Sequence, residues 1–80
     1  MDALDMLIKD EVPLAIETTQ GTHSRLHYFE GSLDRGTVLH ALNSIRRSAT
    51  FEEAVGLAFL ASPDRGENGW RPLSALDPRF

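Results

Sequence analysis

The sequence predicts an α+β fold, with one domain over residues 1–80 in which helices pack against a β-hairpin. The spacing of apolar residues changes along the chain, from a helical repeat to alternation and back again. A glycine interrupts the alternating stretch, as in the turn of a hairpin. The length leaves room for only one hydrophobic core, and a hydrophobic content of 41% is sufficient to form it.

The first predicted element is a short N-terminal helix. Leu4, Leu7 and Ile8 recur at the spacing of one helix face, and Asp2 precedes them as an N-cap. Pro13 ends this helix, because proline cannot continue it.

A β-hairpin is predicted over residues 13–31. The runs LAIETTQ and SRLHYFEG both alternate, and the short loop at Gly21 joins them. We expect the outward face to invite pairing with a partner or a second copy, because it places an aromatic ring among charges on an edge strand. The outward residues are Glu17, Thr19, Arg25, His27 and Phe29.

Two consecutive helices are predicted next, over residues 34–47 and 51–61. Asp34 opens the first of them, and Thr50 with Glu53 has the spacing of a capping box before the second. The second helix is apolar on nearly all sides, so we expect it to be the most buried element.

The segment 63–80 is predicted to be an ordered tail that packs on the same core. A two-stranded hairpin is marginal alone, so we expect a third strand from residues 69–73 or from another subunit. The anchors of the tail are Trp70, Leu73, Leu76 and Phe80.

Charge and composition limit the location and the partners. The formal net charge is −4, so phosphate backbones repel the chain on average. The chain has no cysteine, which agrees with a reducing compartment. Its first residues carry acids rather than a basic cluster, and no apolar run approaches the ~20 residues that cross a bilayer. We therefore expect a cytoplasmic protein.

No pattern points to catalysis, a cofactor or a metal. The serines lack the G-x-S-x-G frame, and the glycines do not form a phosphate loop. His23 and His27 lie in a turn and a strand, where four residues span about 13 Å, too far to share one ion. We expect that the protein is not an enzyme and uses neither a cofactor nor a metal.

The predicted helices 34–47 and 51–61 have the outline of a helix-turn-helix. The second helix of that motif needs polar and basic side chains to read DNA, whereas FEEAVGLAFLA carries two acids and no base. Direct nucleic-acid binding is therefore disfavoured, and a regulatory nucleic-acid binder stays an alternative. Its contacts would be Arg25, Arg35, Arg46 and Arg47.

Binding to another protein is the function that the sequence favours, and two surfaces are candidates for it. One is the glycine-punctuated loop with Arg65, Trp70 and Arg71, since tryptophan and arginine dominate interface hot spots; Trp70 suits a core position equally well. The other is a set of carboxylates suited to a partner with a basic nucleic-acid-binding surface. The acidic set comprises Asp2, Asp5, Asp10, Glu11, Glu17 and Glu30.

In its size, acidic charge, lack of cysteine and lack of a catalytic frame, the chain is similar to small phage-encoded inhibitors such as the anti-CRISPR proteins. No motif carries this resemblance, which rests on general character. It implies a protein that blocks a nucleic-acid-binding partner by occupying its basic site. The alternative is an accessory or structural subunit of a larger complex. The small core also favours a homodimer.

Overall fold

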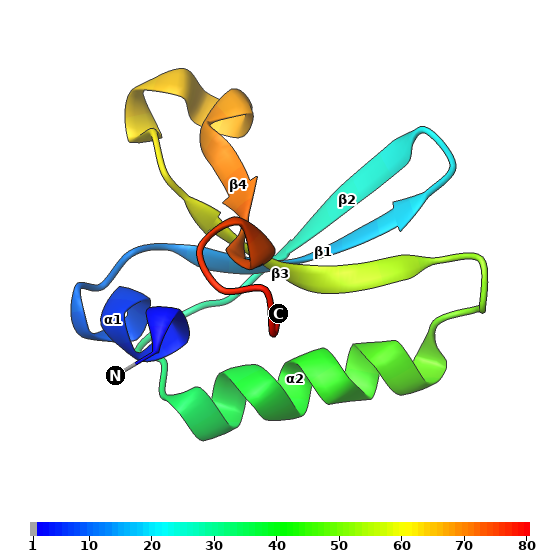
Figure 1. The fold of residues 1–80 in the computed structure, drawn as a ribbon, viewed down its shortest axis with the longest axis horizontal. Coiled ribbons are helices and arrows are strands. Elements are labelled where there is room, and N and C mark those ends of the chain that lie inside the picture. Colours follow the sequence, from blue (N-terminus) through cyan, green and yellow to red (C-terminus); the bar gives the residue numbers. More distant parts are fainter. Residues whose placement is uncertain (1) are drawn as a thin grey trace.

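The computed structural model describes residues 2–80, which form an antiparallel four-stranded sheet with helices against one face. The strand order is β2-β1-β3-β4. In Figure 1, α2 runs below β3, while β4 and the tip of the β1–β2 hairpin extend upward from it. The elements are α1 (Ala3–Lys9), β1 (Leu14–Gln20), β2 (His23–Tyr28), α2 (Arg35–Ser48), β3 (Ala54–Leu60) and β4 (Trp70–Pro72), with 3-10 turns at Pro63–Gly69 and Leu73–Ala75.

Both α-helices begin at the aspartates expected to cap them. The Asp2 carboxylate accepts a hydrogen bond from the Asp5 backbone N–H at 3.0 Å, and that of Asp34 accepts one from Thr37 at 2.8 Å. Each bond satisfies a backbone donor that the first helical turn leaves without a partner. The short N-terminal helix and the helix near residues 34–47 are therefore confirmed.

The hairpin is also present, and its turn explains its register. Gln20 pairs with His23, so the loop is the two residues Gly21 and Thr22. Gly21 has a φ of 61°, and a positive φ at the first central position alone is the pattern of a type II′ turn, which favours glycine there.

The expected composition of the hairpin's outer face is wrong. Ile16 pairs with His27, and Glu17 pairs with Leu26, so His27 shares the face that α2 covers. Glu17 lies on the opposite face with Leu26. The sequence pattern indicates which residues of each strand share a face. Only the turn geometry decides which face of one strand matches which face of the other.

The predicted helix 51–61 is instead the strand β3, which lies between β1 and β4. Thr50 and Glu53 do interact: the Thr50 hydroxyl donates to the Glu53 carboxylate at 3.1 Å, and the Glu53 N–H donates to the Thr50 carbonyl. These bonds close a turn that leads into a strand. Phe51, expected in a buried helix, is 98% exposed. A central strand is apolar on both faces, so its sequence lacks the alternation that identifies an exposed strand.

The C-terminal segment supplies the edge strand beyond β3. β4 pairs with β3 through Leu60↔Trp70 and Ala58↔Pro72, which confirms the strand expected from residues 69–73. Leu73 is fully buried and Phe80 packs against the core, whereas Leu76 is exposed.

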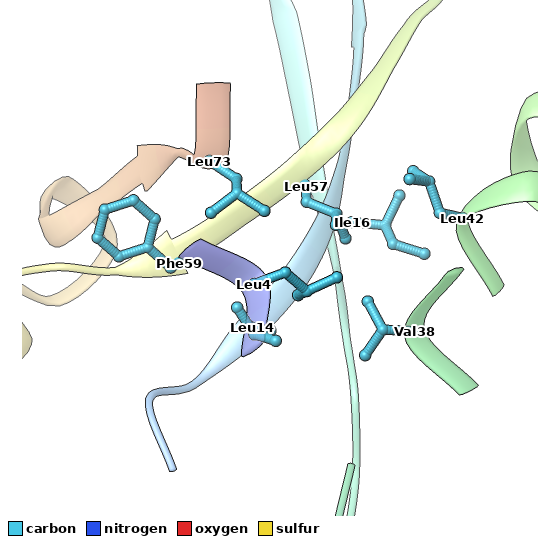
Figure 2. Packing of buried hydrophobic residues seen from close by; sticks show 8 residues of the cluster. All are labelled: Leu4, Leu14, Ile16, Val38, Leu42, Leu57, Phe59 and Leu73. Atoms are coloured by element: carbon cyan, nitrogen blue, oxygen red, sulfur yellow. The ribbon is translucent and has the colours of Figure 1, made fainter. Parts of the chain in front are cut away.

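One hydrophobic cluster fills the space between the sheet and the helices, as Figure 2 shows. It draws on α1, α2, the strands β1 and β3 and the C-terminal segment, so elements distant in sequence share one core. The buried members are Leu4, Leu14, Ile16, Val38, Leu42, Leu57, Phe59 and Leu73. Across residues 2–80, no helix combines the length and apolarity needed to cross a membrane.

Candidate partner-binding groove

An open groove of about 460 Å³ lies where the α1–β1 loop, the end of β2 and the start of β4 meet. Three aromatic side chains line it, together with aliphatic residues from the α1–β1 and β2–α2 loops. The lining residues that matter below are Glu11, Val12, Tyr28, Phe29, Leu33 and Trp70.

Tyr28 and Trp70 form an aromatic corner at this groove. Their ring centroids are 5.7 Å apart, and the ring planes meet at 61° in an edge-to-face arrangement. Tyr28 belongs to β2 and Trp70 to β4, the two outer strands of the sheet. Edge-to-face geometry brings the positive edge of one ring to the negative face of the other. Tyr28 nevertheless remains 61% exposed, so much of its ring is open to a partner.

Two alanines lie on the inner strands, between the outer strands that carry Tyr28 and Trp70. Tyr28 pairs with Ala15, Ala15 with Ala58, and Ala58 with Pro72, so the four residues form one row across the sheet. Residues in such a row share a face, and this face points away from α2. Ala15 and Ala58 are both buried, at 0% and 2% exposure. Only small side chains therefore occupy the inner-strand positions of this row.

Glu11 enters the groove from the C-terminal end of α1. The Glu11 N–H donates to the Ile8 carbonyl at 3.1 Å, and the Val12 N–H donates to the Leu7 carbonyl at 3.0 Å. This pair of bonds is a Schellman motif, in which the residue at the Glu11 position adopts a left-handed conformation and is usually glycine. Glu11 has a φ of 56° and is the only non-glycine residue with a positive φ among residues 2–80.

The lining of the groove carries one negative charge. Glu11 is the only charged residue in its lining. The exposed residues that adjoin lining residues in the sequence carry both signs: Asp10 and Glu30 are acidic, whereas Lys9 and Arg71 are basic. The structure therefore brings part of the predicted acidic set together with Trp70, two candidate surfaces that the sequence presents as separate.

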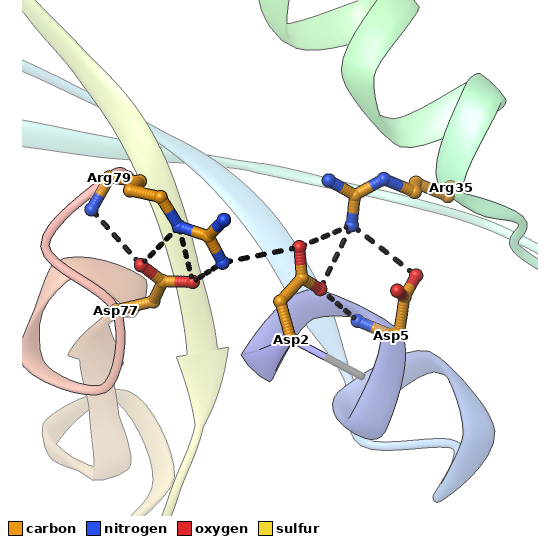
Figure 3. A network of polar contacts seen from close by, with 5 residues as sticks. All are labelled: Asp2, Asp5, Arg35, Asp77 and Arg79. Carbon is orange, nitrogen blue, oxygen red and sulfur yellow. Dashed lines mark hydrogen bonds and ion pairs between the residues drawn. The ribbon is translucent and has the colours of Figure 1, made fainter.

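Two of the predicted partner-binding acids belong to an internal polar network instead (Figure 3). The Arg35 guanidinium contacts Asp2 at 2.8 Å and Asp5 at 3.3 Å. Arg79 contacts Asp77 at 2.6 Å and Asp2 at 3.6 Å. This network ties α1 to the first turn of α2 and to the C-terminal segment, so Asp2 and Asp5 are already paired with cations.

The network lowers the pKa of its two central carboxylates. The Asp5 backbone N–H, followed by the Arg35 guanidinium, holds the pKa of Asp2 below its usual value. The Arg79 side chain, followed by its backbone N–H, lowers the pKa of Asp77. Hydrogen bonds to the ionised form produce both shifts.

The other predicted contact residues are dispersed. Glu17 lies half-buried on β1, and Arg65 lies exposed in the 3-10 turn Pro63–Gly69. Arg71 is exposed, and its guanidinium donates to the carbonyls of Asn68 and Trp70. The predicted acidic and arginine residues therefore do not form one continuous surface.

A second, more polar groove of about 710 Å³ separates the hairpin from the end of α2. His23, Arg25 and His27 line it, and the Thr18 hydroxyl lies 3.2 Å from His27 Nε2. Within residues 2–80, no three His, Cys, Asp or Glu side chains are grouped closely enough to hold a metal ion. Of the arginines suggested for nucleic acid, Arg25 lines this groove and Arg35 belongs to the network.

Tyr28 and Phe29 both line the groove, although the alternation in the sequence places them on opposite faces of the hairpin. Alternation places neighbouring strand residues on opposite faces, and both line the groove only because it lies at the end of β2. No local signal predicts this, since the β3–β4 pairing is what brings Trp70 to Tyr28.

Comparison with known proteins adds no relative: no family model, curated protein or solved structure matches the chain.

Proposed function

We propose that this chain is a non-enzymatic domain that binds another protein through the groove formed by Glu11, Tyr28, Phe29 and Trp70. The observation that carries the proposal is the exposed aromatic corner of Tyr28 and Trp70. Tyrosine and tryptophan are enriched among the residues that contribute most to protein–protein affinity. An aromatic surface left open on a small domain is typical of an interaction site.

The charge of the groove lining favours a partner with a basic surface. Glu11 is the only charged residue in the lining, which contains no basic residue; exposed Asp10 and Glu30 adjoin lining residues in the sequence, as do the basic Lys9 and Arg71. Complementary charge steers association and disfavours acidic competitors. A nucleic-acid-binding protein presents such a surface, and the domain would inhibit it by covering that surface.

Site-specific photo-crosslinking in producing cells tests this proposal. A benzophenone amino acid replaces Tyr28 in one variant and His40, on the exposed side of α2, in the matched control. We expect one defined protein to crosslink from position 28 and not from position 40. Adding Trp70→Ala to the first variant should abolish the product, because it removes the other wall of the corner.

Two results would contradict the proposal. One is an equal set of crosslinked proteins from both positions, which indicates nonspecific contact. The other is a product from position 28 that persists unchanged when Trp70 is replaced.

A further inference from the structure

We infer that the groove binds a cationic side chain, a guanidinium or an ammonium group on an extended segment of the partner, with Glu11 as its counter-charge. This inference rests on the proposed function and specifies its chemistry. The cation would lie against the faces of Tyr28 and Trp70.

The aromatic corner has the geometry that a cation requires. Cations bind over ring faces within about 6 Å of the centroid, and tryptophan is the strongest of the aromatic side chains in this respect. The rings of Tyr28 and Trp70 meet at 61° rather than stacking flat, so they present two walls instead of a closed pair. The groove beside them is open to solvent and large enough for the end of a lysine or arginine side chain.

Glu11 supplies the charge, and its backbone indicates that the carboxylate has a use beyond folding. A non-glycine residue in the left-handed region is less stable than glycine, and the Schellman position is the one where glycine is usual. None of the ion pairs within residues 2–80 includes Glu11, so the carboxylate compensates no internal charge. Strain that the fold does not need is typical of functional positions.

Glu11 differs from the acids of the polar network, which stabilise the fold. Asp2 stabilises the fold twice, as the cap of α1 and as a partner of Arg35. Glu11 does neither, although its backbone amide completes the Schellman motif with any residue type. Replacing Glu11 by glycine should therefore increase the stability of the fold and weaken binding in the groove.

Binding of short peptides to the purified protein tests the inference. The probes are acetylated and amidated tri-arginine, tri-lysine and tri-citrulline, the last being a neutral analogue of arginine. Trp70 is the only tryptophan, so its fluorescence and its indole N–H resonance report binding in this groove. We expect both cationic peptides to bind more weakly as salt rises, and tri-citrulline not to bind.

Matched variants assign the effect to individual groups. Glu11→Gln should weaken tri-arginine binding about fivefold, whereas Glu52→Gln, which removes the same charge from the exposed α2–β3 turn, should not. Tyr28→Leu keeps an apolar side chain but removes the ring, and it should weaken binding about threefold. Glu11→Gly should weaken binding at least as much as Glu11→Gln while raising the melting temperature by about 4–8 °C.

Three results would overturn the inference: tri-citrulline binding as well as tri-arginine, no response to tri-arginine at millimolar concentration, or equal effects of Glu11→Gln and Glu52→Gln. Each of these leaves the crosslinking result at position 28 intact if only the partner's chemistry is wrong. Loss of that crosslink specificity, by contrast, removes the proposed function itself.

Discussion

Gly69 is the residue whose substitution most directly tests how β4 is held in place. Its carbonyl accepts hydrogen bonds from the N–H groups of Ala61 and Ser62, at 2.8 and 3.1 Å. A Cβ atom at position 69 would lie 2.0 Å from the Ser62 carbonyl oxygen and 2.8 Å from its carbonyl carbon. Because both atoms belong to the backbone, the clash cannot be relieved by rotating a side chain.

The magnitude follows from the two ways in which Gly69→Ala can relax. If the backbone holds, overpacking of this kind costs about 1–3 kcal/mol. If the strands move apart instead, two hydrogen bonds are lost or weakened, each with a net value of about 1 kcal/mol. We therefore expect a loss of about 2–3 kcal/mol in the free energy of unfolding, which lowers the melting temperature of a chain this size by about 10–20 °C.

Urea and thermal unfolding followed by circular dichroism measure this loss. Gly56→Ala is the matched control, because a Cβ atom there meets only the Phe80 carbonyl oxygen, at 4.0 Å, an ordinary contact distance. We expect the control to change stability by no more than about 0.5 kcal/mol. Equal stabilities of the two variants would refute the close approach of Gly69 to Ser62, and with it the described placement of Trp70.

Three further predictions concern the core, the turn before β3 and the polar network. Leu42→Ala should lower the free energy of unfolding by about 2–5 kcal/mol in urea titrations, because Leu42 is fully buried between α2 and the sheet; a loss below about 1 kcal/mol would contradict that packing. Thr50→Ala should cost less than about 0.5 kcal/mol in the same assay, since its hydroxyl bonds Glu53 at an exposed turn; a loss near 1 kcal/mol would instead indicate a helix cap. Asp77→Asn should lower the melting temperature at pH 7 and approach the wild type below about pH 4, because a carboxylate with a lowered pKa stabilises the fold only while ionised. A constant difference between pH 7 and pH 3 would show that Asp77 acts without its charge.

Elements fixed by short-range chemistry could be predicted from the sequence. The caps at Asp2 and Asp34 and the turn at Gly21 depend on contacts within three residues, and the structure contains all three. The α+β class followed from these local patterns.

The strand β3 could not be predicted in the same way. Its identity depends on β1 and β4, which pair with it from distant parts of the chain. The Thr50–Glu53 interaction is compatible with a helix cap and with a turn, so it does not distinguish the two. Burial on both faces then removed the alternation that would have identified a strand.

The groove was predictable in its components but not in its assembly. Glu11 and Trp70 are recognisable as interaction residues by type, but their proximity requires both the α1 terminus and the β3–β4 pairing. The separation of Asp2 and Asp5 from the other acids was equally hidden, because Arg35 lies more than 29 residues away from either.

Ala15 and Ala58 pair across the two inner strands and are buried on the sheet face that points away from α2. A bulkier residue at position 15 would crowd Tyr28, its partner in the row, and so alter the aromatic corner without replacing a residue that lines the groove. Such a substitution would change which partner side chains the groove accepts while keeping every lining residue unchanged. Selectivity would be tuned from inside the sheet, at positions that a survey of surface residues would pass over.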